Sequence, residues 1–254
     1  SLNNSGVEVS LEGSIIQKDD FTWNAGFNVS FDRNEITELT QDEFINGTKL
    51  WKEGNSLYQF YVREYAGVDP SNGDALWYKD ILDVDGEPTG VKEVTNDYAT
   101  ATRYETGKES IPDFMGGFNT NVRFKNFDLS LLFNFSFGAY IYDSTYASLM
   151  NGFENLGRAA SPDLATRWQN PGDVTYVPRL SNASNDFNAT SDRFLFQNDY
   201  IRLKALNIGY NFDKDLIAKA GLSEVRIYFQ GDNLFTYQSH EGIDPEQSFA
   251  GTTN

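Results

Sequence analysis

Residues 114–138 read FMGGFNTNVRFKNFDLSLLFNFSFG, and they contain two runs of alternating apolar and polar side chains. In the second run the odd positions all carry large apolar side chains: Phe127, Leu129, Leu131, Phe133, Phe135 and Phe137. The even positions are small or polar, except for Leu132. A period of two indicates a β-strand whose faces meet different environments. Because only Lys125 and Asn126 separate the runs, they predict a hairpin with a two-residue turn.

The length of these runs leaves two interpretations open. Each run is 11 residues long, whereas strands of soluble proteins average about five or six residues and a strand that crosses a bilayer needs ~9–11. In a soluble sandwich the aromatic face would point into a core. In a transmembrane barrel it would point to lipid, and the polar face would line a wet lumen.

The same pattern recurs along the chain, so we expect about eight antiparallel strands in an all-β fold. Besides the two runs of the hairpin, the predicted strands are 7–15, 21–31, 57–65, 75–79, 199–212 and 225–237. In the last of these the alternation breaks at Gly231-Asp232-Asn233, which indicates a β-bulge. In 199–212, Arg202 and Lys204 occupy even positions, as the apolar residues of this strand do, so they are predicted on the apolar face. Cationic side chains on that face suit a position at a membrane rim.

The connections between these strands alternate in length. Short ones at 17–20, 68–73, 125–126 and 213–223 are interleaved with long ones at 33–56, 80–110 and 143–198. This alternation is typical of outer-membrane barrels, which have tight periplasmic turns and long extracellular loops. We expect short helices in these connections, one beginning at Ser161-Pro162 and one after Asp213. Eight strands without closure leave two open edges, so the chain is interpreted as a segment of a barrel.

Composition narrows the function classes. The 254 residues carry a net charge of −17, which argues against binding to nucleic acid or to an anionic lipid surface. No apolar run is long enough for a transmembrane helix, a finding that does not bear on a barrel. Aromatic residues make up 15% of the chain, as expected for a barrel with aromatic girdles. With no Cys and His240 as the only histidine, neither a zinc site nor a catalytic triad is predicted, and we expect no enzyme.

Several short motifs resemble the barrel of SusC/RagA-like TonB-dependent transporters. They match in order and spacing over nearly the whole chain: YAGVDP (65–70), ALWY (75–78), GGF (116–118), FDLS (127–130), RWQNPGD (167–173), SDRFL (191–195), DYIRLK (199–204) and NLFT (233–236).

This resemblance implies a fold, a location and a set of partners. Family members are outer-membrane proteins of Bacteroidota with a ~22-stranded barrel and an N-terminal plug. They import glycans or peptides with energy supplied through TonB, and a SusD-like surface lipoprotein closes over the barrel. On this resemblance, residues 1–254 are the C-terminal portion of such a barrel, without the plug and the closing strand. The alternatives are a soluble carbohydrate-binding β-sandwich and a surface β-protein that does not transport.

The alternation assigns side chains to the two faces of the predicted wall. Those predicted to face lipid are Phe21, Trp23, Phe27, Phe31, Phe127, Leu129, Leu131, Phe133, Phe135 and Phe137. Those predicted to face the lumen are Asn119, Asn121, Arg123, Asn134, Gln230 and Asp232. The lumen set is a candidate for contact with a passing solute; the alternative is that it hydrates the wall or bonds to a plug.

Two further candidate sites lie in the loops. Trp51, Trp77 and Trp168 have apolar ring faces and N–H donors that suit stacking on sugar rings; packing within the loops is the alternative. Asp83, Asp85 and Glu87 surround Gly86 with a spacing that faintly resembles a Ca²⁺ loop, although the full twelve-residue pattern is missing. Apart from this possible structural calcium, no cofactor is expected.

Overall fold

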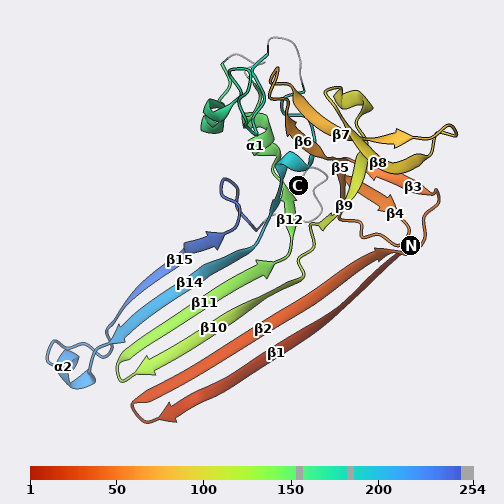
Figure 1. Ribbon diagram of the computed structural model, residues 1–254. Coiled ribbons are helices and arrows are strands. Elements are labelled where there is room, and N and C mark those ends of the chain that lie inside the picture. Colours follow the sequence, from red (N-terminus) through yellow and green to blue (C-terminus); the bar gives the residue numbers. More distant parts are fainter. Residues whose placement is uncertain (153–156, 182–185, 247–254) are drawn as a thin grey trace.

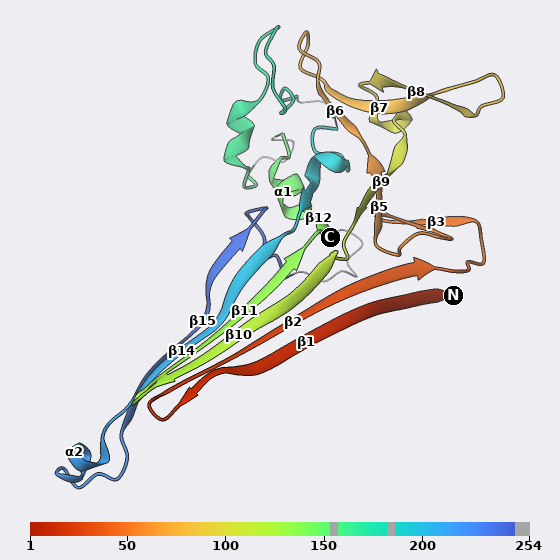
Figure 2. The same ribbon diagram turned by 60° about the horizontal axis from the view of Figure 1, so that its bottom comes forward.

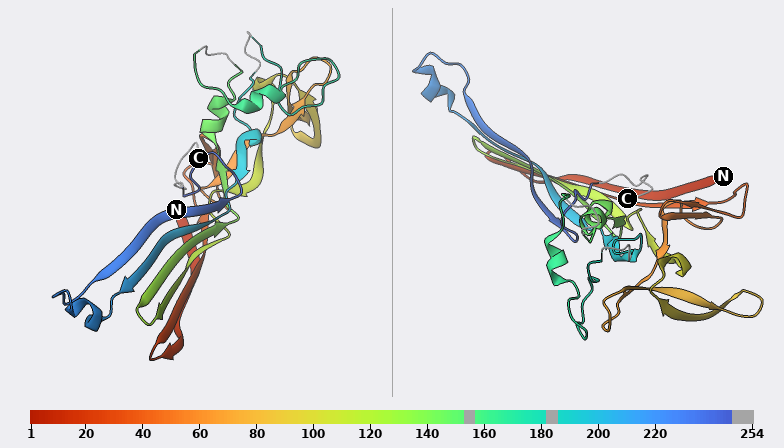
Figure 3. Two further views of the ribbon diagram at one scale, coloured as in Figure 1. Left: turned by 90° about the vertical axis from the view of Figure 1, so that its left-hand side faces the viewer. Right: turned by 90° about the horizontal axis from the view of Figure 1, so that it is seen from above.

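The computed structural model describes residues 1–152, 157–181 and 186–246. Within these ranges the chain divides into one long sheet, here called the wall, and a group of loops at one end of it, here called the cap (Figure 1). The cap comprises residues 37–113, 138–152, 157–181 and 186–199. Seen from above, it lies on one side of the wall (Figure 3).

The wall is a six-stranded antiparallel sheet in the order β1-β2-β10-β11-β14-β15. The strands are long, as the alternation predicted: β1 Leu2–Lys18, β2 Phe21–Ile36, β10 Phe114–Phe124, β11 Phe127–Phe137, β14 Tyr200–Asn211 and β15 Arg226–Gln238. The hairpin of β10 and β11 pairs from Phe114↔Phe137 to Phe124↔Phe127 without a break, so the predicted two-residue turn is confirmed.

The connections are sorted by the end of the wall at which they lie (Figure 2). Residues 19–20, 125–126 and 212–225 turn at one end, and the last of these contains α2 (Lys214–Ala218). The two long excursions both leave from the other end and build the cap. This is the arrangement of short turns and long loops found in outer-membrane barrels.

The prediction of about eight wall strands is wrong by two. The strands predicted at 57–65 and 75–79 form, but they pair inside the cap. One cap sheet joins β3 Glu43–Asn46, β4 Lys49–Lys52, β5 Gln59–Arg63 and β9 Arg103–Glu109. A second sheet joins β6 Tyr65–Val68, β7 Ala75–Leu82 and β8 Pro88–Thr95. A two-stranded sheet joins β12 Tyr140–Tyr142 and β13 Leu195–Gln197. A period of two reports a strand with two different faces, and it carries no information on which strand lies beside it.

Short helices occur in the connections, as expected. They are η1 Tyr98–Thr100, α1 Ser144–Leu149, η2 Pro162–Thr166 and η3 Asp192–Phe194 in the cap, together with α2. The helix predicted at Ser161-Pro162 is the 3-10 helix η2, and Ser161 Oγ caps it by accepting from Asp163 N at 3.2 Å. Over the part of the chain that the structure describes, no helix has the length and apolarity to cross a membrane.

The buried core lies in the cap. Two clusters of buried side chains form it, one around Phe60, Phe187 and Phe194 and the other around Tyr65 and Trp77. The aromatic face of the wall, in contrast, stays open: Phe31 is 45% exposed and Phe127 is 56% exposed. Because a sandwich would bury this face against a second sheet, the soluble β-sandwich interpretation does not fit the structure.

Candidate functional site: the polar face of the wall

The register places the two predicted sets of side chains on opposite faces of the wall. Phe27 pairs with Phe118, which pairs with Phe133, and paired residues point to the same side of a sheet. The ten residues predicted to face lipid all share this side. On the other side Asn121 pairs with Ser130 and Asn24, and the six residues predicted to face the lumen share that polar side.

The apolar face is covered by aromatic contacts between neighbouring strands. The rings of Phe27 and Phe135 stack with centroids 5.9 Å apart, and those of Phe114 and Phe137 stack at 5.2 Å. Two polar side chains on this face bond to each other: Trp23 Nε1 donates to Thr120 Oγ1 at 2.9 Å. Internal pairing of this kind is what a face in contact with hydrocarbon requires.

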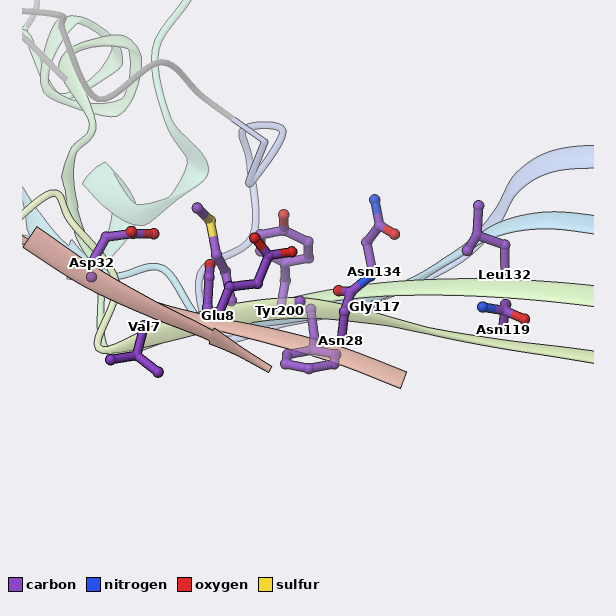
Figure 4. Close-up of a pocket in the computed structure, with 14 residues that line it drawn as sticks. Val7, Glu8, Asn28, Asp32, Gly117, Asn119, Leu132, Asn134 and Tyr200 are labelled. Carbon is purple, nitrogen blue, oxygen red and sulfur yellow. The ribbon is translucent and has the colours of Figure 1, made fainter. Parts of the chain in front are cut away.

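The polar face is hollowed on the side of β1, β2 and β10. A hollow of about 730 Å³ is lined by carboxylates, amides and a phenol, among them Glu8, Asn28, Asp32, Asn119, Asn134 and Tyr200, and at its edges by the apolar side chains of Val7, Met115, Leu132 and Phe135. Figure 4 shows Glu8, Asn134 and Tyr200 pointing to one side of the sheet, with Val7 on the opposite side. A second hollow of about 780 Å³ shares Asp32 with the first and reaches Gln59 and Glu109 in the cap. Together we call these two hollows the polar groove.

The charge of the polar groove is negative because its lining carries more carboxylates than cations: Glu8, Asp32, Glu35, Glu109 and Asp113 against Arg33. Arg226 binds Asp128 at 2.6 Å, and Arg202 binds Asp244 at 2.9 Å. Within the described ranges, Glu8 and Asp32 have no cation within 4.0 Å. The groove therefore offers amide, hydroxyl and free carboxylate groups to a polar solute.

The relatives of the chain are receptors of one kind. No protein-family model matches the chain. It is 34% identical over its full length to TonB-dependent receptor P3 of Formosa agariphila and 25% identical over 97% of its length to TonB-dependent receptor SusC of Bacteroides thetaiotaomicron. It superposes on the solved structure of the RagAB peptide transporter with a TM-score of 0.79 and 28% identity over 99% of the chain. The chain corresponds over its full length to one segment of the SusC/RagA-like TonB-dependent receptors.

This receptor segment is a fraction of the proteins it matches. It spans 26% of P3, 24% of SusC and 27% of the RagAB chain. Its six wall strands are therefore part of an antiparallel transmembrane β-barrel, and the open edges of β1 and β15 are edges of a segment.

The three tryptophan candidates have different surroundings in the receptor segment. Trp77 is 1% exposed and belongs to a core cluster of the cap, so its prediction as a contact for a solute is wrong in this structure. The reason is that alternation along β7 places its ring on the inward face. Trp168 packs on Gly73 and donates from Nε1 to Pro70 O at 3.1 Å. Trp51 lies on β4 with its ring 5.4 Å from that of Phe44, and both remain candidates.

The calcium candidate lies at the tip of the hairpin of β7 and β8. Asp83 Oδ1 accepts from the backbone N–H groups of Asp85 and Glu87 at 2.9 and 3.0 Å, which closes the turn. No group of three acidic, His or Cys side chains able to hold a metal ion occurs in the described part of the receptor segment. The calcium site stays a prediction.

Arg202 is a functional candidate that the alternation of the sequence assigned to the wrong face of the wall. The register of β14 shifts between Leu203 and Ala205, so Lys204 stands at a bulge. Arg202 consequently pairs with Asn134 and Thr236 on the polar face, where it is 6% exposed. The break predicted at residues 231–233 lies opposite this bulge. It is the sequence signal that even-numbered residues of β14 face opposite sides of the wall before and after the bulge.

The cap holds two buried cations. Lys49 Nζ donates to Tyr58 O at 3.0 Å and lies 3.1 Å from the ring centroid of Phe60. Burial lowers the pKa of Lys49 to about 7, with Glu109 acting in the opposite direction. Burial also lowers the pKa of Arg193, which donates to Phe187 O at 2.7 Å. Four aromatic rings surround the Arg193 guanidinium: Tyr65, Tyr176, Phe187 and Phe194.

Proposed function

We propose that the chain forms part of the barrel of an outer-membrane active transporter that imports glycans or peptides. The observation that carries this proposal is the two-faced wall, whose apolar face is bare and whose polar face is hollowed. Transport needs a wall of this kind, because one face must be stable in hydrocarbon while the other stays wet. In this role the chain moves a solute and catalyses no reaction of its own.

The aromatic face of the wall is assigned to lipid in this proposal. Its ten predicted members share one side with other exposed apolar residues, among them Ile208, Ile227 and Phe229. The polar groove, with Asn119 and Asn134 in its lining, is assigned to the lumen. Asn121, Arg123, Gln230 and Asp232 lie on the same side and extend this wet surface over β10 and β15.

The partners follow from the relatives. RagAB is named a peptide transporter and SusC a TonB-dependent receptor. A SusD-like surface lipoprotein is therefore proposed to close over the barrel on the side of the cap. TonB is proposed to act through parts of the receptor outside this chain, and the location is the outer membrane of a Bacteroidota-like bacterium. Acidic loops and an acidic groove make a nucleic-acid partner unsuitable.

Deletion of the full-length receptor gene in its own host tests this proposal. Cells and outer-membrane vesicles that contain the receptor are compared with those that lack it. The quantity measured is the uptake of fluorescent neutral glycans and of fluorescent peptides of similar mass. Uptake of one class is expected to be lost on deletion and also on removal of TonB. A receptor that fractionates with the outer membrane but whose deletion leaves both classes of uptake intact would support a surface protein without transport instead.

A further inference from the structure

The segment that follows β15 turns back onto the cap and the wall. Residues 239–246 are here called the strap. At its start, Ser239 N donates to Asp199 O at 2.9 Å and Ser239 Oγ donates to Gln197 O at 2.6 Å. These bonds tie the strap to the residues immediately before β14, so its path is set from its first residue.

One end of the strap is fixed to the cap through His240. Its ring stacks on Phe196 of β13 with centroids 3.9 Å apart and planes inclined by 4°. His240 Nε2 also lies 2.8 Å from Asp143 Oδ2. Asp143 is buried, and its other oxygen caps α1 by accepting from Tyr146 N at 2.7 Å. His240 therefore contacts two elements of the cap, β13 and the N-cap of α1.

The other end of the strap is fixed to the wall through Arg202. The guanidinium binds Asp244 at 2.9 Å and Glu246 at 3.1 Å, and its Nε donates to Thr236 Oγ1 at 2.9 Å. Lys204 adds a second ion pair to Glu246 at 2.6 Å. A planar guanidinium that is buried and binds two carboxylates holds them in a fixed geometry.

The strap borders the polar groove on the side of β14. Arg202 pairs across the sheet with Asn134, and Tyr200 lies two residues away on the same face. Both Asn134 and Tyr200 line the groove. The strap carboxylates that bind Arg202 therefore lie next to the groove, at the end nearer the cap. The Asp244 side chain is 57% exposed, so water and salt can compete for this contact.

We propose that residues 239–246 act as a strap that holds the cap against β14 and limits access to the polar groove beside Asn134 and Tyr200, with Arg202 as its positioning residue. The inference rests on the proposed function in so far as the groove is the path of a solute. Release of the two carboxylates detaches the strap from β14, while His240 and the bond that Asn198 Nδ2 donates to Pro245 O at 2.9 Å keep it on the cap. The groove is then more accessible beside Asn134 and Tyr200.

Thiol labelling of the full-length receptor in its own outer membrane, with its own partner, tests the strap. The chain has no Cys, so Asn134→Cys in an otherwise cysteine-free receptor gives one thiol in the groove. Its rate of reaction is measured with a cationic and with an anionic methanethiosulfonate added from outside. Two strap variants are compared: Arg202→Gln, and Asp244→Asn combined with Glu246→Gln. They change the local charge in opposite directions, so a gain in rate with both reagents in both variants reports access.

Both strap variants are expected to raise the labelling rate ~10- to 100-fold, which corresponds to the loss of charge-assisted hydrogen bonds. Added salt should raise the rate of the Asn134→Cys parent and change the variants little. Arg226→Gln is the matched control, since it breaks the Arg226–Asp128 pair on the same face and should leave the rate unchanged.

Hydrogen exchange of the strap peptide, measured in parallel, confirms whether the strap is released. A strap that exchanges faster while the Asn134→Cys rate stays within twofold would show a purely structural contact and overturn the inference. If Arg202→Gln does not fold, the carboxylate variant still decides the matter, because its changes lie on the exposed strap. Labelling needs no transported solute, so a failure of the proposed function leaves this readout intact.

Discussion

A Cβ atom on Gly116 of β10 would lie 2.1 Å from the carbonyl oxygen of Asn28 on β2. The same atom would lie 2.9 Å from the ring of Phe135, which covers the glycine from β11. The close approach of the two strands therefore depends on the missing side chain, and an aromatic ring fills the space above it.

Gly116→Ala is expected to destabilise the barrel by ~1–3 kcal/mol, because the backbone of β2 must move to admit the methyl group. Gly13→Ala is the matched control, since a Cβ on Gly13 of β1 meets no atom within 4 Å. The urea midpoint of the full-length receptor in detergent micelles measures both. Equal midpoints for the two variants would contradict the close packing of β10 on β2.

The wall hairpin was predictable because each of its residues faces one of two contrasting environments. Alternation over 114–137 fixed the two strands, the turn at Lys125-Asn126 and the membership of both faces. The same holds for the bulge, because Gly231-Asp232-Asn233 interrupts a clear period. The face of the wall on which Arg202 lies could not be predicted from the sequence of β14 alone. The bulge at Lys204 exchanges the two faces, but Lys204 is a cationic residue like Arg202, so no change in residue type marks the bulge.

The strands of the cap and their pairing could not be predicted, for a different physical reason. The eight residues of β8, Pro88–Thr95, are almost all exposed on both faces, so no alternation marks the strand. β5 and β7 do alternate, but their partners are set by the path of the loops, which no local pattern records. Trp77 lies on the alternating strand β7, but the alternation does not show which face of that strand is turned into the cap.

Neighbouring substitutions on β11 separate the two faces of the wall. Phe133→Arg places a charge on the apolar face and is expected to cost ~2–4 kcal/mol if it lies near the bilayer midplane. Leu132→Arg, one residue away, points into the polar groove and should change stability by less than about 1 kcal/mol. Folded fractions in outer-membrane vesicles, read from heat-modified mobility on gels, measure the difference. A similar loss for both variants would contradict the assignment of the faces.

The stability of the cap is expected to rise with pH between about 7 and 10.5. Over this window folded Lys49 is neutral, because burial lowers its pKa to about 7, whereas unfolded Lys49 stays charged up to its ordinary value of 10.5. The unfolded state then binds more protons, so the free energy of unfolding increases with pH, by up to about 5 kcal/mol. Below pH 7 both states are charged and the dependence ends.

Hydrogen exchange at the Tyr61 amide reports this change, since Tyr61 N donates to Thr48 O beside Lys49. After correction for intrinsic exchange, its protection in the full-length receptor should grow from pH 7 to 10. Lys49→Met should remove the slope, and the Tyr78 amide, in the other cap sheet, serves as the internal control. A slope that persists in Lys49→Met would assign the effect to another group.

Substitution of Arg193 tests what a buried cation contributes among four aromatic rings. Arg193→Ala removes the packing and leaves Phe187 O without its donor, so we expect a loss of ~3–5 kcal/mol in cap stability. Arg193→Met keeps much of the apolar stem and removes the cost of burying a charge. It should therefore cost less than half as much as Arg193→Ala. Exchange at the Asp143 amide, which donates to Phe194 O at 2.9 Å, reports both variants. Equal losses would instead assign the stability to the charge and its contact with the ring faces.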